Sequence, residues 1–325
     1  MDWLLLVASF CIGIVVGLTG MGGGALMTPA LIFFFKVDPL VAISSDLVAS
    51  AVMKPAGAAV HLRRKTVNLR LVGWLCMGSV PAAFCGVLIT RAVGDGEALQ
   101  DFLQSALGVA LMIAALGLIV RAYLRLLERA RIRDGMVGPY RSGPPEVVVR
   151  PIPTVIVGAV GGLVVGVTSV GSGSLIIITL MVLYPGLKAA ELVGTDLVQA
   201  VPLVASAAVS HLLFGDFSLS LTVPMLLGAV PGAFLGAQIS SRAPGGLVRR
   251  ALAFVLLASA LKLLGVSTPV TGLLLGLTLL VAPPMWMLVR RHHGFRAMSG
   301  GRWIRGAVRT RSDPVRDEPQ KQGAD

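Results

Sequence analysis

Two glycine-rich segments interrupt apolar stretches of this chain, and their residue types suit the binding of an anion. The first covers residues 17–24 and the second covers residues 166–173, 149 positions later. A helix that begins after such a break presents backbone N–H groups and the positive end of its dipole to the surroundings. Hydroxyl side chains at the breaks add further hydrogen-bond donors. The candidate substrate-binding residues at the breaks are Thr19, Gly20, Gly22, Gly23, Gly24, Thr168, Ser169, Gly171, Ser172, Gly173 and Ser174.

A lysine lies near the middle of an apolar segment at residues 40–62. The ends of this segment are far from Lys54, so its ammonium group cannot easily reach the membrane surface. A cation inside a membrane costs about 2.5–3.5 kcal/mol on insertion scales and marks a transport pathway or an ion pair. Lys54 is therefore a candidate for balancing the charge of a bound anion. The structural alternative is a pair with Asp46 or with a backbone carbonyl.

Four further ionisable residues form two corresponding pairs. Asp46 corresponds to Asp196, and His61 corresponds to His211, at an offset of 150. The acids suit either proton transfer during coupling or the capping of helix ends near the breaks. The histidines suit either proton coupling or ordinary hydrogen bonding near the membrane surface. Both alternatives stand for each pair.

The sequence lacks the motifs of enzymes and metal sites. It has no Gly-x-Ser-x-Gly nucleophile turn, no pair of histidines at zinc spacing and no Gly-x-x-x-x-Gly-Lys nucleotide loop. Cys11, Cys76 and Cys85 lie in apolar segments and are expected to pack as small side chains. We therefore expect no catalytic residue, no cofactor, no metal site and no use of ATP.

Long apolar segments must position these residues. Of the 325 residues, 55% are apolar and 14% are charged. Apolar runs of about 18–25 residues recur along the chain, and each is long enough to cross a hydrocarbon layer of roughly 30 Å. This predicts an all-α fold, a polytopic bundle of transmembrane helices. The expected segments are residues 3–19, 25–36, 40–62, 69–91, 100–122, 153–168, 174–184, 189–213, 218–240, 247–265 and 270–289.

An internal duplication organises these segments into two halves. Chance similarity between apolar segments would not match glycines, a proline, an acid and a histidine in the same order. The matched residues include Gly78, Pro81, Phe84 and Gly86 with Gly228, Pro231, Phe234 and Gly236. The expected regions are a first transmembrane repeat at 1–123, a cytoplasmic linker at 124–152, a second repeat at 153–266, an additional helix at 267–290 and a basic, disordered tail at 291–325.

The basic residues indicate how the chain is oriented. They number 28 against 16 acidic residues and cluster in alternate loops, which the positive-inside rule places in the cytoplasm together with the C-terminus. This placement favours membrane lipid over nucleic acid as the partner of the positive charge. The two halves then run in opposite directions, which is the inverted-repeat plan of secondary transporters. Each break is expected to join a pair of short helices that meet inside the membrane.

Three groups of residues carry a family resemblance: Gly20–Gly24 with Pro29, Val193–Leu197 with His211, and Gly228–Gly232. They resemble the sulfite exporter TauE/SafE family, also called transmembrane sulfur-compound permeases, and the resemblance covers about residues 3–265. It implies a bacterial inner-membrane permease of two helical halves that handles sulfite, sulfonates such as sulfoacetate, or related organic sulfur anions. Ser44-Ser45 before Asp46 and Ser172 in the second break depart from the family pattern, and the substrate stays open.

The sequence therefore predicts a secondary transporter of a small anion, a sulfur oxyanion or organosulfonate, that works by alternating access with protons as coupling ions. The alternatives are a carrier of a carboxylate or other anion, a passive pore, and a membrane-bound enzyme or scaffold without transport. In a scaffold, the glycines would serve only helix packing, and alanine would be tolerated at Gly22, Gly24, Gly171 and Gly173. Small residues on the helix faces also suit a homodimer.

Overall fold

A computed structural model of the chain describes residues 3–19, 23–63, 65–94, 96–133, 148–171, 175–187, 189–240 and 245–293. The regular secondary structure in these ranges is entirely helical, as expected. The helices of the first half are α1 (Trp3–Thr19), α2 (Gly24–Phe35), α3 (Pro39–Arg63), α4 (Leu69–Ala92) and α5 (Glu97–Arg133). Those of the second half are α6 (Pro151–Thr168), α7 (Leu175–Leu183), α8 (Ala189–Phe214), α9 (Leu219–Ser240) and α10 (Gly245–Leu263). The last helix is α11 (Thr268–His292).

The chain separates into two compact units, Met1–Thr278 and Leu279–Asp325. The first unit holds α1 to α10 and the beginning of α11, and the described part of the second unit is the rest of α11. Within the described residues, seven helices are long and apolar enough to cross a membrane: α3, α4, α5, α6, α8, α9 and α11. The expected polytopic helical bundle is thus confirmed.

Helix α5 is longer than the sequence predicted. The expected linker began at residue 124, but the helix continues to Arg133. Residues 124–133 consist mainly of leucine, arginine, alanine and glutamate, which all have high helix propensity. The helix therefore extends past its apolar part. Residues 134–147 of the expected linker and the tail after residue 293 lie outside the described residues.

The two breaks lie where the sequence predicted them, but the helices on either side of each break are unequal. Helices α1 and α6 have 17 and 18 residues, whereas α2 and α7 have 12 and 9. At about 1.5 Å per residue, the first helix of each pair spans most of a bilayer core and the second does not. The expected pair of short helices is therefore a long helix followed by a short one.

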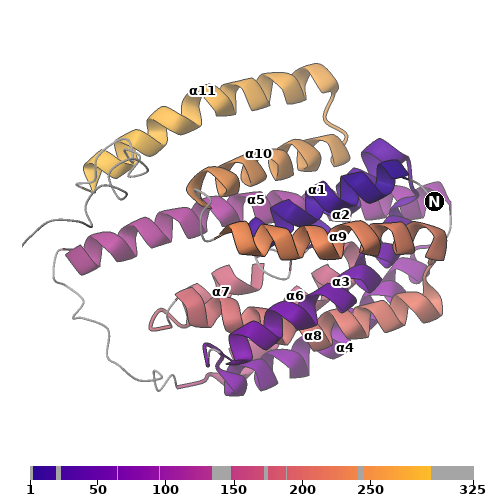
Figure 1. Cartoon of the computed structure of the whole chain (residues 1–325), viewed down its shortest axis with the longest axis horizontal. Coiled ribbons are helices and arrows are strands. Elements are labelled where there is room, and N and C mark those ends of the chain that lie inside the picture. Colours follow the sequence, from indigo (N-terminus) through magenta and orange to yellow (C-terminus); the bar gives the residue numbers. More distant parts are fainter. Residues whose placement is uncertain are drawn as a thin grey trace, which may run out of the picture. The chain divides into compact units, whose positions relative to one another are not determined.

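The first helix of each half packs against the fourth helix of the other half. Helix α1 lies along α9, and α6 lies along α4 (Figure 1). Glycine makes both contacts close, because a Cβ at Gly228 would overlap the Leu6 backbone and a Cβ at Gly78 would overlap the Val155 backbone. Gly78 and Gly228 are matched residues of the duplication expected from the sequence. The two halves thus contact each other closely at matched glycine positions.

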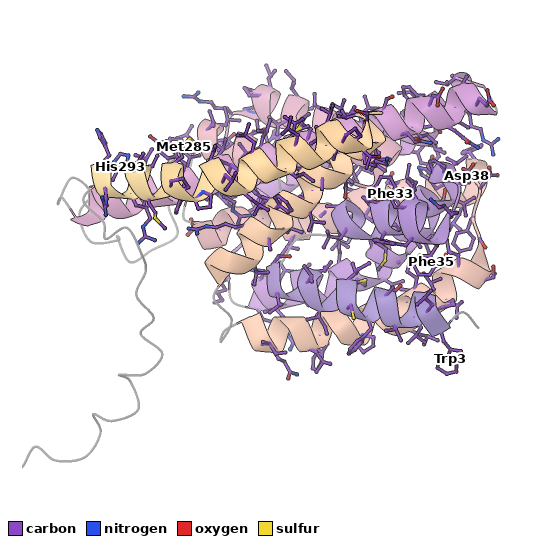
Figure 2. The ribbon with its side chains drawn as sticks, turned by 90° about the horizontal axis from the view of Figure 1, so that it is seen from above. Trp3, Phe33, Phe35, Asp38, Met285 and His293 are labelled. Atoms are coloured by element: carbon purple, nitrogen blue, oxygen red, sulfur yellow. The ribbon has the colours of Figure 1, made fainter. Side chains whose placement is uncertain are left out.

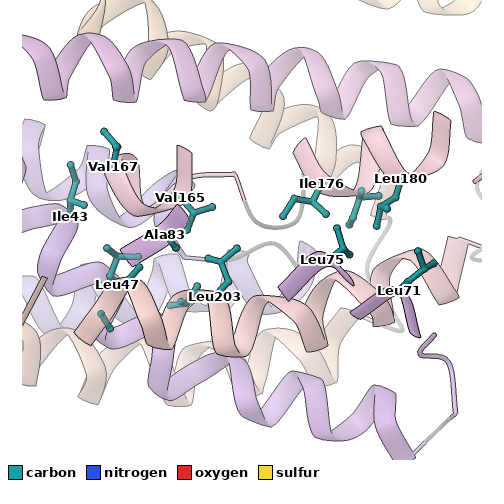
Figure 3. Packing of buried hydrophobic residues seen from close by; sticks show 14 of the residues in the cluster. Ile43, Leu47, Leu71, Leu75, Ala83, Val165, Val167, Ile176, Leu180 and Leu203 are labelled. Atoms are coloured by element: carbon teal, nitrogen blue, oxygen red, sulfur yellow. The ribbon is translucent and has the colours of Figure 1, made fainter. Parts of the chain in front are cut away.

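Apolar side chains pack between the halves in the interior, and other apolar side chains cover the outside. One buried cluster combines residues of α3, α4, α6, α7 and α8 (Figure 3), including Leu47, Ala83, Val165, Ile176 and Leu203. On the outside, large apolar side chains are exposed, as lipid-facing surfaces require. Trp3, for example, is 71% exposed and projects from the start of α1 (Figure 2).

The glycine contact between α4 and α6 leads to a stability prediction. Gly78→Val is expected to lower the free energy of unfolding by about 3 kcal/mol, because the new side chain must push two helix backbones apart. Gly73→Val is the matched control on the same helix, since a Cβ at Gly73 meets no atom within 4 Å. Thermal unfolding in detergent measures both. Equal stability of the two variants would contradict the packing described here.

Candidate functional site

The two glycine breaks meet in the structure, although they lie in different halves of the sequence. Gly24 at the start of α2 packs directly against the backbone of Ser169, which follows α6. A Cβ at residue 24 would overlap the Ser169 carbonyl oxygen. Candidate residues from both breaks therefore share one place. The candidates Gly20, Gly22, Ser172, Gly173 and Ser174 lie outside the described residues.

The backbone at the second break leaves the helical path at two positions. Ser169 has a φ of 60° and its N–H donates to the Val165 carbonyl at 2.7 Å, which ends α6. Gly171 has a φ of +126°, a conformation that favours glycine. At the first break, the Gly23 carbonyl accepts the N–H groups of Leu26 and Met27. Local backbone geometry thus holds each break in place.

The threonines at the breaks use their hydroxyl groups within their own helices. Thr19 donates to the Val15 carbonyl at 2.9 Å, and Thr168 donates to the Val164 carbonyl at 2.6 Å. These bonds satisfy the hydroxyls at the C-terminal ends of α1 and α6. In this conformation neither proton is directed at a bound anion.

Asp46 of α3 lies where the two breaks meet. Its carboxylate accepts a hydrogen bond from the Ser169 hydroxyl of the second break. On the side of the first break, a Cβ at Gly23 would lie 3.4 Å from Asp46 Oδ1 and 3.8 Å from Ser50 Oγ. Asp46 is only 2% exposed. A buried carboxylate thus links α3 to both breaks.

Lys54 lies on the same face of α3, two turns after Asp46 and one turn after Ser50. Spacings of four residues place these side chains one above another. Lys54 is buried, and its charge interacts with the carboxylates of Asp196 and Asp46, with Asp196 contributing more. Lys54 therefore lies within electrostatic reach of both acids, including the acid of the second half. With all three groups ionised, this buried cluster has a net charge of −1.

The corresponding positions of the second half are apolar. Ser50 and Lys54 correspond to Ala200 and Val204 at an offset of 150. Thr28, a buried residue of α2 that lies close enough to act on Asp46, corresponds to Ile177 at an offset of 149. Neither Thr28 nor Ser50 was predicted from the sequence as part of this site. A hydroxyl in one repeat opposite an apolar residue in the other was the signal that could have identified them.

The two histidines lie at opposite ends of the contact between α3 and α8. His211 is fully buried, with Nδ1 2.8 Å from Ser44 Oγ and Nε2 2.8 Å from the Gly166 carbonyl oxygen. His61 is half-buried, with Nδ1 2.9 Å from Thr66 Oγ1, and Gly194 packs against it. These contacts show that α3 and α8 run antiparallel where they touch. The structure therefore does not bring the histidines together.

This difference predicts unequal effects of alanine at the two histidines. His211→Ala is expected to lower the free energy of unfolding by about 2 kcal/mol, because it leaves Ser44 and the Gly166 carbonyl without these buried partners. His61→Ala, at the more exposed end, is the matched control and is expected to cost less. Thermal unfolding in detergent gives the comparison. A larger loss for His61→Ala would contradict the assigned hydrogen bonds.

Comparison with known proteins identifies the family. The family model described as Sulfite exporter TauE/SafE matches residues 5–263. The chain belongs to the TauE/SafE family. The probable membrane transporter protein YjnA of Bacillus subtilis (strain 168) is 35% identical over 254 residues, which cover 78% of this chain and 96% of YjnA. The probable membrane transporter proteins YdhB and YunE of the same organism are 24% and 25% identical and cover 77% and 74% of this chain and 94% and 88% of their own lengths. No solved structure matches.

Family membership confirms the resemblance seen in the sequence and makes this TauE/SafE protein a multi-pass membrane transporter rather than an enzyme. The matched region contains both breaks, Asp46, Lys54 and Asp196, so the candidate site belongs to the part shared with the family. Helix α11 begins after the matched region ends. Among the described residues, no group of three or more histidine, cysteine, aspartate or glutamate side chains could hold a metal ion.

Proposed function

We propose that this TauE/SafE protein is a permease for a small anion, a sulfur oxyanion or an organosulfonate such as sulfite or sulfoacetate, and that it works by alternating access. The observation that supports this proposal is the contact of Gly24 with Ser169 beside the buried cluster of Asp46, Lys54 and Asp196. The family description names sulfite export, and sulfite is an oxyanion of the kind that such a site would bind.

The anion would bind between the start of α2 and Lys54. The first N–H groups of a helix have no partner inside the helix, and its dipole is positive at that end. The Lys54 ammonium supplies a full positive charge and three donors. A sulfonate or sulfite group offers several acceptor oxygens to these donors. A bound anion would take over part of the interaction that Lys54 makes with Asp196 and Asp46.

Alternating access requires two halves that can exchange roles. In support, α3 and α8, which hold Asp46 and Asp196, run antiparallel, and Gly78 and Gly228 make equivalent contacts with the opposite half. These features suit inverted repeats around a central site. Under the positive-inside rule, the arginine-rich loops support a cytoplasmic C-terminus and a location in the bacterial inner membrane.

Charge balance favours protons as the coupling ions. The cluster of Asp46, Asp196 and Lys54 already has a net charge of −1, and an anion would raise it to −2. Concentrated charge of one sign in a membrane is costly. A proton on one of the carboxylates offsets the charge of the anion and would move with it.

Transport currents from purified protein in liposomes on a supported membrane would test the proposed substrate class. We expect saturating currents with sulfite or sulfoacetate and a weaker current with sulfate. Acetate that moves with one proton carries no net charge, so it is compared by isotope uptake, where a preference for acetate would favour a carboxylate carrier. Currents that rise without saturation would indicate a pore. Silence with every anion, followed by no isotope uptake, would contradict the proposal.

A further inference from the structure

We infer that Asp46 is the binding site of the coupling proton and that its protonation releases the Ser169 hydroxyl to bind the anion. This inference rests on the proposed anion transport and assigns the coupling to one carboxyl group. It follows from the different surroundings of the candidate proton carriers.

The other candidates are engaged with partners other than the Ser169 hydroxyl. Asp196 is the principal charge partner of Lys54. Both ring nitrogens of His211 lie at hydrogen-bonding distance from Ser44 and Gly166. His61 lies at the other end of the contact between α3 and α8, beside Thr66. Asp46 alone among these four touches residues of both breaks.

The groups around Asp46 suit a carboxyl that changes its protonation state. A neutral carboxylic acid accepts one hydrogen bond and donates another. The Ser169 hydroxyl donates to Asp46 Oδ2. The buried Thr28 hydroxyl lies beside the Asp46 carboxyl group, but its Oγ1 is not in hydrogen-bonding geometry with any described group. When Asp46 is protonated, Thr28 Oγ1 can therefore accept a hydrogen bond from the new O–H group without breaking another hydrogen bond.

No other ionisable group of the neighbouring helices competes for this role. Helices α2, α6 and α9 contain no ionisable side chain, and the ionisable residues of α5 lie before residue 102 or after residue 120. On α8, Glu191 lies in the first turn, at the end that contacts His61, Asp196 interacts with Lys54, and His211 is bonded as described. On α3 itself, Lys54 is the charged residue that acts on Asp46. The protonation of Asp46 is thus linked mainly to Lys54 and to whatever binds beside it.

Protonation of Asp46 would favour the anion in two ways. A carboxylate accepts the Ser169 hydroxyl in a charge-assisted bond, which is about twice as strong as a neutral one. A proton on Oδ1 weakens this bond, so the Ser169 hydroxyl can turn toward the anion. The proton also removes one negative charge from the site. Because binding free energies are reciprocal, the anion in turn favours protonation of Asp46.

This linkage sets the direction of the pH dependence. The protonated form binds the anion better, so the apparent affinity is expected to rise as the pH falls. With one proton taken up per anion, the affinity changes by up to about tenfold per pH unit. A strong-acid sulfonate such as methanesulfonate is included among the anions, because it stays fully ionised and its own charge does not change as the pH falls.

Proton uptake on anion binding tests the assignment in weakly buffered detergent solution. Wild type is expected to take up about one proton per anion bound. Asp46→Asn is expected to bind the anion with no proton uptake and to exchange anions without responding to a pH gradient. Asp196→Asn is the matched control and is expected to retain proton uptake. Uptake that persists in Asp46→Asn, or disappears only in Asp196→Asn, would overturn the inference.

Infrared difference spectra between acid and neutral pH provide a second test that needs no substrate and no transport. Wild type is expected to show the band of a buried carboxylic acid, which Asp46→Asn lacks and Asp196→Asn retains. The reverse pattern would overturn the inference. If no anion binds to wild type, the proposed function fails, while these spectra still decide whether Asp46 binds the proton. If Asp46→Asn does not fold, proton counting on wild type still tests the coupling, since no uptake on binding would refute it.

Discussion

Lys54→Met is expected to reduce saturable anion transport by at least about 100-fold. Lys54 is buried and its charge interacts with Asp196 and Asp46, and methionine fills a similar volume without the charge. An anion would then face two carboxylates with no cation. Truncating one partner of a buried, hydrogen-bonded charge pair in a binding interface costs about 2–5 kcal/mol of binding free energy, and each 1.4 kcal/mol corresponds to a tenfold change in affinity. Transport currents in liposomes give the measurement.

Loss of transport alone would not separate a role in binding from a role in folding. Lys54→Met leaves Asp196 without this charge partner, so stability is also expected to fall. The double variant Lys54→Met with Asp196→Asn removes the pair together and is expected to recover stability but not transport. Recovery of transport in the double variant, or unchanged half-saturation in the single variant, would show that Lys54 serves only to pair Asp196.

Gly24→Ala is expected to impair both stability and transport, whereas Gly23→Ala is expected to be tolerated. The methyl group at residue 24 would overlap the backbone of Ser169 and force the two breaks apart. We expect a loss of about 2 kcal/mol of unfolding free energy, typical of overpacking, and a larger proportional loss of transport. Thermal unfolding and liposome currents measure the two effects.

Gly23 makes a closely matched control because it is the adjacent residue. A Cβ at Gly23 meets Asp46 Oδ1 at 3.4 Å, an ordinary contact, and its φ of −57° suits any residue. Equal effects of the two alanines would show that the breaks do not touch as described. The result at Gly24 does not by itself separate transport from scaffolding, because the overlap with Ser169 exists in either case. Tolerance of alanine at Gly24 therefore does not distinguish a scaffold from a transporter.

Much of the fold could be predicted because its signals are local. A run of about 20 apolar residues identifies a membrane helix wherever it packs, since backbone groups in lipid must bond within their own helix. Glycine clusters marked both breaks, and the matched Asp46 and Asp196 led to the prediction of a duplication. Helix α5 continues past the predicted apolar segment to Arg133, because residues of high helix propensity extend a helix beyond its apolar part.

The sequence by itself determined the class of protein, the positions of the breaks and the presence of Lys54 in an apolar segment. Only the tertiary structure decided which of these residues meet. It brought Gly24 to Ser169, added Thr28 and Ser50 to the surroundings of Asp46, gave Lys54 a second acidic neighbour in Asp196 and separated the two histidines. The physical reason is that contacts between helices depend on their register and direction. Close packing at glycines such as Gly78 and Gly228 sets both, and the spacing of residues along one helix does not encode them.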